Sequence, residues 1–349
     1  IDLTGNGSLY GTLGNTAISG MYNNVVEVSG AYVYLAGSSG GFSDVFKYEM
    51  DGDLVDSSFL STLFLGTISQ IYKSPDISEF FVGGSRGVGG SETPVLNKYS
   101  SSGVLDVVFT DDDIDDLGGY IGYEGTSVLY YYNNKIYVGG NFTRPAVIYR
   151  KTFVELNALT GEPTDWFPKI LSGSGSGYIY DMLLKDNQLV IAGGYTTIDS
   201  ISRNNLASFD LNTLTLTSFN PDVDDYVTSL ASRNDTLYFG GAFLNVSGQA
   251  RSRLAALNLN NGALLSWAPI TNGATQDFEL NGPNIYLAGY FSNINGQVRN
   301  RLAALDISGN LLPLSVSITN VGDLESIELD GDILYVGGSF NSFGGLTRK

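Results

Sequence analysis

Residues 249–259 read QARSRLAALNL, and residues 297–307 read QVRNRLAALDI. A looser copy of the same phrase, SISRNNLASFDL, occupies residues 200–211. The arginines that align in the three copies, Arg203, Arg251 and Arg299, are 48 residues apart in each step. A fixed spacing of this length indicates an internal repeat, in which one supersecondary unit is copied along the chain.

A second marker extends the repeat over the whole chain. A short apolar run ending in glycine occurs seven times, as in IYVGGNF at 136–142 and LYFGGAF at 237–243. The gaps between successive markers run from 47 to 56 residues. The marker glycines are Gly37, Gly84, Gly140, Gly194, Gly241, Gly289 and Gly338.

Each unit of about 50 residues has room for four short strands. The regular unit contains YVTSLAS at 226–232, TLYFGGAF at 236–243, RLAALNL at 253–259 and LLSWAP at 264–269. A turn sequence such as NNG separates the third run from the fourth, which is typical of a hairpin. Four strands repeated radially form the blade of a β-propeller. The sequence therefore predicts an all-β fold, a seven-bladed propeller of four-stranded blades, as one domain over residues 1–349.

The two ends of the chain complement each other in the repeat. In the regular units Asp or Asn follows the aligned arginine by seven residues, but the chain stops at Lys349, directly after Arg348. The first residues, IDLTGNGSLYG, read like the missing second half of a third strand, with Asp2 in the expected position. We therefore expect the N- and C-terminal segments to pair in one blade and close the ring, which would remove exposed sheet edges.

Composition excludes several classes of function. The 18 Lys and Arg residues against 36 Asp and Glu residues give a net charge of −18, which repels nucleic acid and anionic lipid. No apolar run is long enough to insert directly into a membrane. The chain has no cysteine and no histidine, so it has no disulfide, no Cys/His zinc site and no Ser-His-Asp triad. It begins at Ile1, and we expect it to be a piece of a longer protein.

The Gly-Gly-x-Phe motif followed by Arg-x-x-Leu-Ala-x-Leu-Asp resembles the delta-sixty β-propeller repeats of bacterial and phage proteins. The chain is also similar to kelch repeats, through the glycine pair, a later Asp or Asn, and an aromatic residue near proline in SFNP, SWAP and DWFP. The resemblance is close over residues 180–349 and looser before them. It implies a fold and no common reaction.

An acidic loop and two nearby tyrosines are the candidate binding residues. Carboxylates at alternate positions of a turn suit calcium, which takes six to eight oxygen ligands, and Asp111, Asp113 and Asp115 have this spacing. The alternative is a solvated acidic loop, because Asp116 stands where a helix-loop-helix calcium site needs glycine. Tyrosine beside glycine and aspartate is common on recognition surfaces. The predicted contact residues are Asp111, Asp112, Asp113, Asp115, Asp116, Tyr120 and Tyr123.

The aligned arginines have a different predicted role. We expect Arg203, Arg251, Arg299 and Arg348 to be structural, held by carboxylates or by backbone carbonyls of their own or the adjacent blade. A ring of arginines that binds sugars or carboxylates is the alternative.

Together these features favour a non-catalytic recognition or structural module of a secreted, cell-surface or virion protein, of the phage tail or fibre type. Its partner would be a protein or a glycan bound through loops, without a cofactor unless calcium binds. The alternative is a carboxylate-dependent glycan hydrolase or lyase, since paired carboxylates can cleave a glycosidic bond without histidine.

Overall fold

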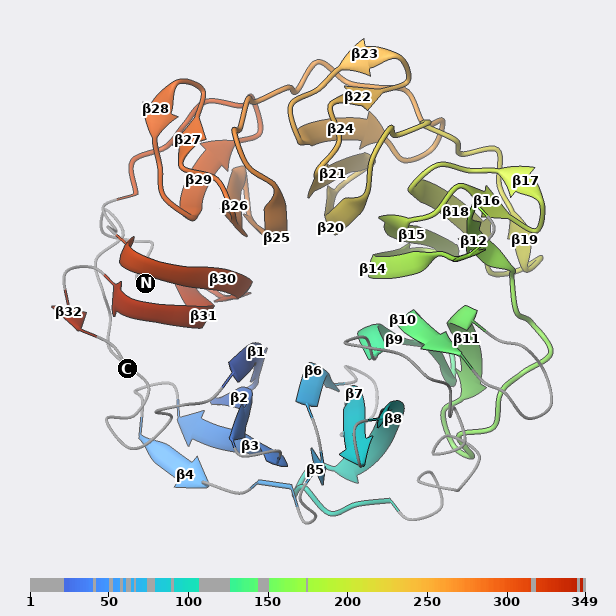
Figure 1. Ribbon diagram of the computed structural model, residues 1–349, viewed down its shortest axis with the longest axis vertical. Helices are drawn as coiled ribbons and strands as arrows, with labels where there is room; N and C mark the ends of the chain where they lie inside the picture. Colours follow the sequence, from blue (N-terminus) through green and yellow to red (C-terminus); the bar gives the residue numbers. More distant parts are fainter. Residues whose placement is uncertain are drawn as a thin grey trace. The chain divides into compact units, whose positions relative to one another are not determined.

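The computed structural model consists of antiparallel β-sheets joined by turns and loops (Figure 1). The residues that it describes are 22–39, 42–49, 53–56, 59–60, 64–65, 67–73, 79–88, 91–106, 126–143, 151–173, 175–314, 318–343 and 346–347. The predicted pairing of the N-terminal segment with the last blade falls outside these residues and stays a prediction. No helix in this part of the chain is long and apolar enough to cross a membrane.

The described chain divides into two compact units. The first comprises Leu183–Gly194 and Arg203–Lys349, and the second comprises Leu13–Met182 and Tyr195–Ser202. Each unit is built from sheets whose strands follow one another in chain order, as the repeat predicts.

The second unit contains three sheets and a smaller one. In the first, β1 (Tyr22–Ser29), β2 (Tyr32–Ser39), β3 (Phe42–Glu49) and β4 (Leu54–Asp56) pair in order, and β5 (Phe64–Leu65) also pairs with β3. The next two sheets are β6 (Thr67–Lys73), β7 (Glu79–Val88) and β8 (Ser91–Ser100), then β9 (Thr126–Tyr132), β10 (Lys135–Thr143) and β11 (Lys151–Asn157). The smaller sheet joins β12 (Ile170–Ser172), β13 (Gly175–Ser176), β16 (Thr197–Ile198) and β17 (Ile201–Ser202).

The first unit contains the regular repeats. One sheet joins β14 (Tyr178–Lys185), whose residues up to Met182 belong to the second unit, to β15 (Gln188–Gly194), β18 (Leu206–Asp210) and β19 (Thr215–Leu216). The other sheets are β20 (Val227–Arg233), β21 (Thr236–Gly241) and β24 (Leu254–Asn258); β25 (Thr275–Asn281), β26 (Asn284–Gly289) and β29 (Leu302–Asp306); and β30 (Ile318–Asp330), β31 (Ile333–Phe343) and β32 (Leu346–Thr347). Two hairpins, β22 (Asn245–Val246) with β23 (Gln249–Ala250) and β27 (Asn293–Ile294) with β28 (Gln297–Val298), connect second and third strands.

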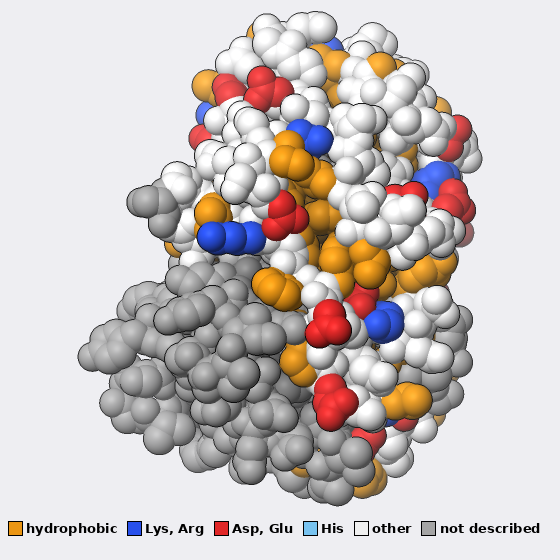
Figure 2. Space-filling model, turned by 90° about the vertical axis from the view of Figure 1, so that its right-hand side faces the viewer, with side chains coloured by type: hydrophobic (Ala, Val, Ile, Leu, Met, Phe, Trp, Pro, Cys, Tyr) orange, Lys and Arg blue, Asp and Glu red, His pale blue; other side chains and the backbone are white. Residues whose placement is uncertain are grey.

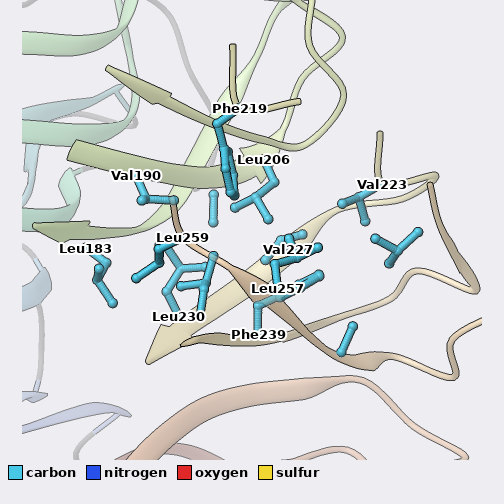
Figure 3. Close-up of a cluster of buried hydrophobic side chains, with 14 of the residues drawn as sticks. Leu183, Val190, Leu206, Phe219, Val223, Val227, Leu230, Phe239, Leu257 and Leu259 are labelled. Carbon is cyan, nitrogen blue, oxygen red and sulfur yellow. The ribbon is translucent and has the colours of Figure 1, made fainter. Parts of the chain in front are cut away.

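The hydrophobic core lies between consecutive sheets. Figure 3 shows one such layer, in which Val190 and Leu206 of one sheet meet Leu230, Phe239 and other residues of the next. Along β21 the contacts alternate, since Leu237 and Phe239 face the preceding sheet and Tyr238 faces the following one. This alternation is the two-residue period of a strand that is buried on both faces. Sheets with two apolar faces are stable only when stacked.

The glycine pair in the repeat marker allows this close stacking. A Cβ atom on Gly240 would collide with the side chains of Phe278 and Thr275 in the next sheet. A Cβ atom on the marker glycine itself, Gly241, would collide with backbone at Tyr226 and Val227 in its own sheet. The two glycines thus serve two different contacts, one between sheets and one within a sheet.

The hydrogen bonds correct the marker in one repeat. The N–H of Gly241 donates to Arg253 O, the N–H of Gly289 donates to Arg301 O, and the equivalent bond is made by Gly193 to Asn205 O. The marker of that unit is therefore Gly193 and not Gly194. The cause is the position of the glycine pair relative to the aromatic residue. In this unit the pair directly precedes Tyr195, whereas Ala242 stands between the pair and Phe243 in GGAF.

We predict that Gly240→Ala lowers the free energy of unfolding by about 1–3 kcal/mol, because the added methyl group overpacks the contact with Phe278. Adding Phe278→Leu should restore much of the loss, since the preceding pair of sheets combines Ala192 with Leu230 at the same positions. Urea unfolding of the two single variants and the double variant measures this coupling. Additive effects of the two substitutions would contradict it.

Candidate functional site

The loops between second and third strands form the most regular exposed feature of the described chain. In the last two regular repeats a short two-stranded hairpin, β22–β23 or β27–β28, lies between the second and third strands, whereas β16–β17 pairs with β12 and β13 in the smaller sheet. The tips of the last two hairpins have two successive residues with positive φ: Ser247 at 51° with Gly248 at 71°, and Asn295 at 51° with Gly296 at 79°. Such backbone angles are those of tight two-residue hairpin turns, which favour Asn, Asp, Ser and Gly.

Polar side chains of the inter-sheet linkers hold these hairpins in place. Asp224 accepts hydrogen bonds from the N–H groups of Leu244 and Asn245, both at 2.9 Å, and from the Asn245 side chain at 2.7 Å. Burial would raise the pKa of Asp224, but the hydrogen bonds from Asn245 and Leu244 outweigh it and lower the pKa. In the next repeat Asn272 accepts from the N–H groups of Ser292 and Asn293. Residues 220–226, which read NPDVDDY, therefore contain an aspartate, Asp224, that holds the following hairpin in place.

The aligned arginines lie beside these hairpins and donate to backbone carbonyls. Arg251 Nη2 donates to Leu265 O at 2.9 Å, and Arg203 Nη2 donates to Thr217 O at 2.9 Å. Arg251 and Arg299 also donate to the carbonyl of the residue before them, both at 2.8 Å. Within the described part of the chain, the Nε atoms of Arg251 and Arg299 are buried without a hydrogen-bond partner. These contacts fit the structural role predicted for the arginines, which remains a prediction; Arg348 lies outside the described residues.

A second arginine of each regular repeat was missed by the sequence analysis. Arg253 and Arg301 have φ of 66° and 65°, a left-handed conformation that costs energy for a side chain of this size, and Asn205 occupies the equivalent position at 63°. Asn205 Nδ2 donates to Val223 O at 2.8 Å, and Arg253 Nη1 donates to Thr271 O at 3.3 Å, so both residues tie the sheet to the following linker.

Arg301 differs from Arg253 in packing on an aromatic ring. Its guanidinium lies 5.2 Å from the ring centroid of Tyr290, a tyrosine that is 44% exposed. The 48-residue spacing between Arg253 and Arg301 is visible in the sequence and could have identified the pair.

Apolar side chains are exposed on the same hairpins. Val298 in β28 is 71% exposed, Ile201 in β17 is 49% exposed, and Leu244 before β22 is 52% exposed. The polar groups around them are used to hold the hairpins and the linkers. The arrangement therefore presents exposed apolar side chains beside polar groups that bond to the backbone, which suits binding of a partner surface more than proton transfer.

Two carboxyl groups on first strands of their sheets, Asp277 of β25 and Glu27 of β1, have raised pKa values. A β-bulge between Thr275 and Asp277 interrupts the pairing of β25, and Asp277 accepts from the N–H groups of Phe278 in its own strand and Ile327 in β30, both at 2.8 Å. Although the Asp277 residue as a whole is only partly buried, burial raises the pKa of its carboxyl group to about 7 against these hydrogen bonds and one from Ser229.

Glu27 of β1 repeats this arrangement in the other unit. It accepts from the N–H of Lys73 in β6 at 3.3 Å, and burial raises its pKa to about 8. Each carboxyl group therefore joins the first strand of its own sheet to the first strand of the next sheet by accepting a backbone hydrogen bond.

The binding residues predicted from the sequence lie elsewhere. Asp111, Asp112, Asp113, Asp115, Asp116, Tyr120 and Tyr123 all fall outside the described residues, so the contact surface and the calcium site assigned to them stay predictions. In the described ranges, no group of three or more Asp and Glu side chains is placed to hold a metal ion. On the face shown in Figure 2, acidic side chains are scattered among neutral ones.

Comparison with known proteins supports the fold. A family model described as a domain of unknown function, DUF5122 beta-propeller, matches residues 284–311, which contain β26 to β29. The match shows that the chain contains β-propeller repeats. No curated protein matches it by sequence.

Solved structures agree with this fold at low identity. The extracellular domain of a hybrid two-component system from B. thetaiotaomicron has a TM-score of 0.59 and 12% identity over 93% of this chain and 38% of that one. A structure of the mitotic checkpoint complex has a TM-score of 0.58 and 14% identity, covering 97% of this propeller and 90% of that chain. The computationally designed Ika8 protein has a TM-score of 0.55 and 13% identity, covering 90% and 80%. Such similarity concerns the fold alone.

We predict that Arg251→Ala lowers the free energy of unfolding by about 1–3 kcal/mol, because the carbonyl of Leu265 loses its donor. Arg251→Lys should recover only part of the loss, since an ammonium group lacks the fork that reaches two carbonyls. Thermal unfolding measures both variants. An unchanged melting temperature in Arg251→Ala would contradict the structural role.

We also predict that Asp277 makes the propeller less stable as pH rises. Its pKa is raised from 3.8 to about 7 on folding, so its contribution to stability is complete below about pH 4 and is lost as pH rises through about 7. Asp277→Asn should remove this component and flatten the difference in unfolding free energy between pH 4 and pH 8. Urea unfolding of both proteins across this range tests the prediction, and identical pH profiles would refute it.

Proposed function

We propose that this propeller is a non-catalytic recognition or structural module of a secreted, cell-surface or virion protein, and that it binds a glycan or a protein partner through its loops. The observation that carries the proposal is the set of repeated hairpins, in which Val298, Ile201 and Leu244 are exposed while Asp224 and the Nη atoms of Arg251 bond to the backbone beside them. One of the similar structures is an extracellular domain, which agrees with this location.

The finer architecture belongs to the same proposal. We infer seven blades, closed by the N-terminal segment pairing in the blade that contains β30 and β31, and repeats of the delta-sixty or kelch-like kind. Support comes from the seven inner strands β1, β6, β9, β14, β20, β25 and β30 in the described part of the chain, each of which begins a separate sheet.

The two inner-strand carboxyl groups with strongly raised pKa values do not favour the glycan-cleaving alternative. Glu27 and Asp277 each accept a backbone hydrogen bond from the next inner strand, which gives them a role in joining sheets. No described residue is therefore assigned as a general acid or base.

A glycan array followed by a product assay on each glycan that binds tests the proposed function. We expect binding without release of smaller sugars, and weaker binding in Val298→Ser with an unchanged melting temperature, because this side chain contacts solvent more than protein. Leu159→Ser is a matched control, since Leu159 is 63% exposed in a turn outside the hairpins. Bond cleavage that a single Asp or Glu substitution abolishes would establish the enzyme instead.

A further inference from the structure

A buried ion pair recurs in two consecutive sheets with its charges reversed. In the β6–β7–β8 sheet, Lys98 Nζ lies 3.1 Å from Glu79 Oε2 and 3.2 Å from Asp106 Oδ2, and the Lys98 side chain is only 4% exposed. In the β9–β10–β11 sheet the buried member is the acid. Glu155, also 4% exposed, has its Oε1 atom 2.8 Å from Lys135 Nζ.

The two groups occupy equivalent positions. Glu79 and Lys135 are the first residues of second strands and pair with Ser100 and Asn157; Lys98 and Glu155 each lie two residues before those partners. The third position is also the same. The N–H of Asp106 donates to Lys98 O at 2.8 Å, and the N–H of Thr164 donates to Glu155 O at 2.9 Å. We call these three positions the cross-strand layer.

The layer changes chemistry along the chain. In the β14–β15–β18–β19 sheet it is neutral and polar: Gln188 Nε2 donates to Ser208 Oγ at 2.9 Å, and Ser208 Oγ lies 2.6 Å from Thr217 Oγ1. In the next two sheets its second and third positions are apolar. They are occupied by Ala256 and Leu265, then by Ala304 and Leu312, with the same backbone hydrogen bond between them.

Reversal of charge has a specific consequence if two sheets exchange their third strands. Pairing β7 with β11 would bring Glu79 to Glu155, and pairing β10 with β8 would bring Lys135 to Lys98. Both exchanges would place like charges together. Pairing β7 with β11 would also leave the buried Glu155 without its ion-pair partner, which is strongly destabilising, whereas Lys98 paired with β10 would keep Asp106 beside the repulsion from Lys135. Pairing β7 or β10 with β18 of the neutral sheet would place the charge of Glu79 or Lys135 beside the hydroxyl group of Ser208.

We propose that the reversed charges of the cross-strand layer specify, between these two sheets, that β8 pairs with β7 and that β11 pairs with β10 during folding. The need for such a device follows from the repeat itself. Neighbouring units have similar apolar strands and glycine pairs, so hydrophobic pattern alone does not distinguish their partners, and misassembly between repeats is a characteristic failure of such chains. The ion pairs distinguish correct from incorrect strand partners and add little to the free energy of unfolding, because the attraction within a buried ion pair only about offsets the cost of removing both charges from water.

The test makes the two layers identical without removing an ion pair. Combining Lys135→Glu, Glu155→Lys and Thr164→Asp in the full chain gives β10 and β11 the charges of β7 and β8. We expect the equilibrium urea midpoint to change little, and the yield of soluble monomer after dilution from urea to fall several-fold, with more misfolded and aggregated protein on size-exclusion chromatography. Reversal of the exposed pair of Lys185 and Asp235, 3.7 Å apart, is the control and should leave the yield unchanged.

A second variant shows whether a lower refolding yield comes from mispaired strands or from disturbance of the substituted sheet itself. Adding Glu79→Lys, Lys98→Glu and Asp106→Thr to the first three substitutions exchanges the two layers and restores their difference. We expect this protein to recover most of the wild-type refolding yield. A triple variant that refolds as well as the wild type would overturn the proposal, and so would a sixfold variant that refolds as poorly as the triple variant.

Discussion

Face-to-face packing of consecutive sheets is the constraint on which the described structure depends. The β20–β21–β24 sheet is apolar on both faces, and its separation from the next sheet is set by a small residue, Gly240, against Phe278. Stability therefore comes from interfaces between repeats as well as from the repeats, which is the energetic pattern of stacked repeat proteins. The second glycine of the pair recurs at Gly289 because its close contact with its own first strand recurs, whereas the first position, which faces the next sheet, is glycine at Gly240 and alanine at Ala192 and Ala288.

Polar side chains hold the loops and linkers in place, because these segments have no hydrophobic core of their own. Arg251 donates a hydrogen bond to the carbonyl of Leu265, and Asp224 accepts one from the N–H of Leu244. A β-propeller organised in this way has rigid hairpins whose exposed side chains are free to vary. Loops on a regular scaffold often carry function, and the proposed recognition would use these hairpins and their exposed apolar side chains.

The sequence predicted the all-β class and the first three strands of the regular repeats, because a 48-residue spacing and alternating apolar residues are local features of the chain. The expected fourth strand appears in the two most regular repeats only as an isolated bridge, between Leu257 and Leu264 and between Leu305 and Leu311. It placed one marker glycine a residue too late, since Gly193 and Gly194 are adjacent and only the hydrogen bond to Asn205 distinguishes them. It missed the left-handed Arg253, because nothing in an arginine signals positive φ. The pairing of Lys98 with Glu79 and Asp106 could not be predicted either, since it depends on the strand register.

Native-state hydrogen exchange tests most directly whether the stacked interfaces hold the β-propeller together. The account predicts that amides of β15, β21 and β26, whose sheets share cores with their neighbours, become exposed in one common opening with a similar free energy. Hairpins β22–β23 and β27–β28 should exchange earlier. Exchange of β26 through an opening that leaves β21 fully protected would contradict the account, because it would show that a sheet can leave the stack without loosening the next.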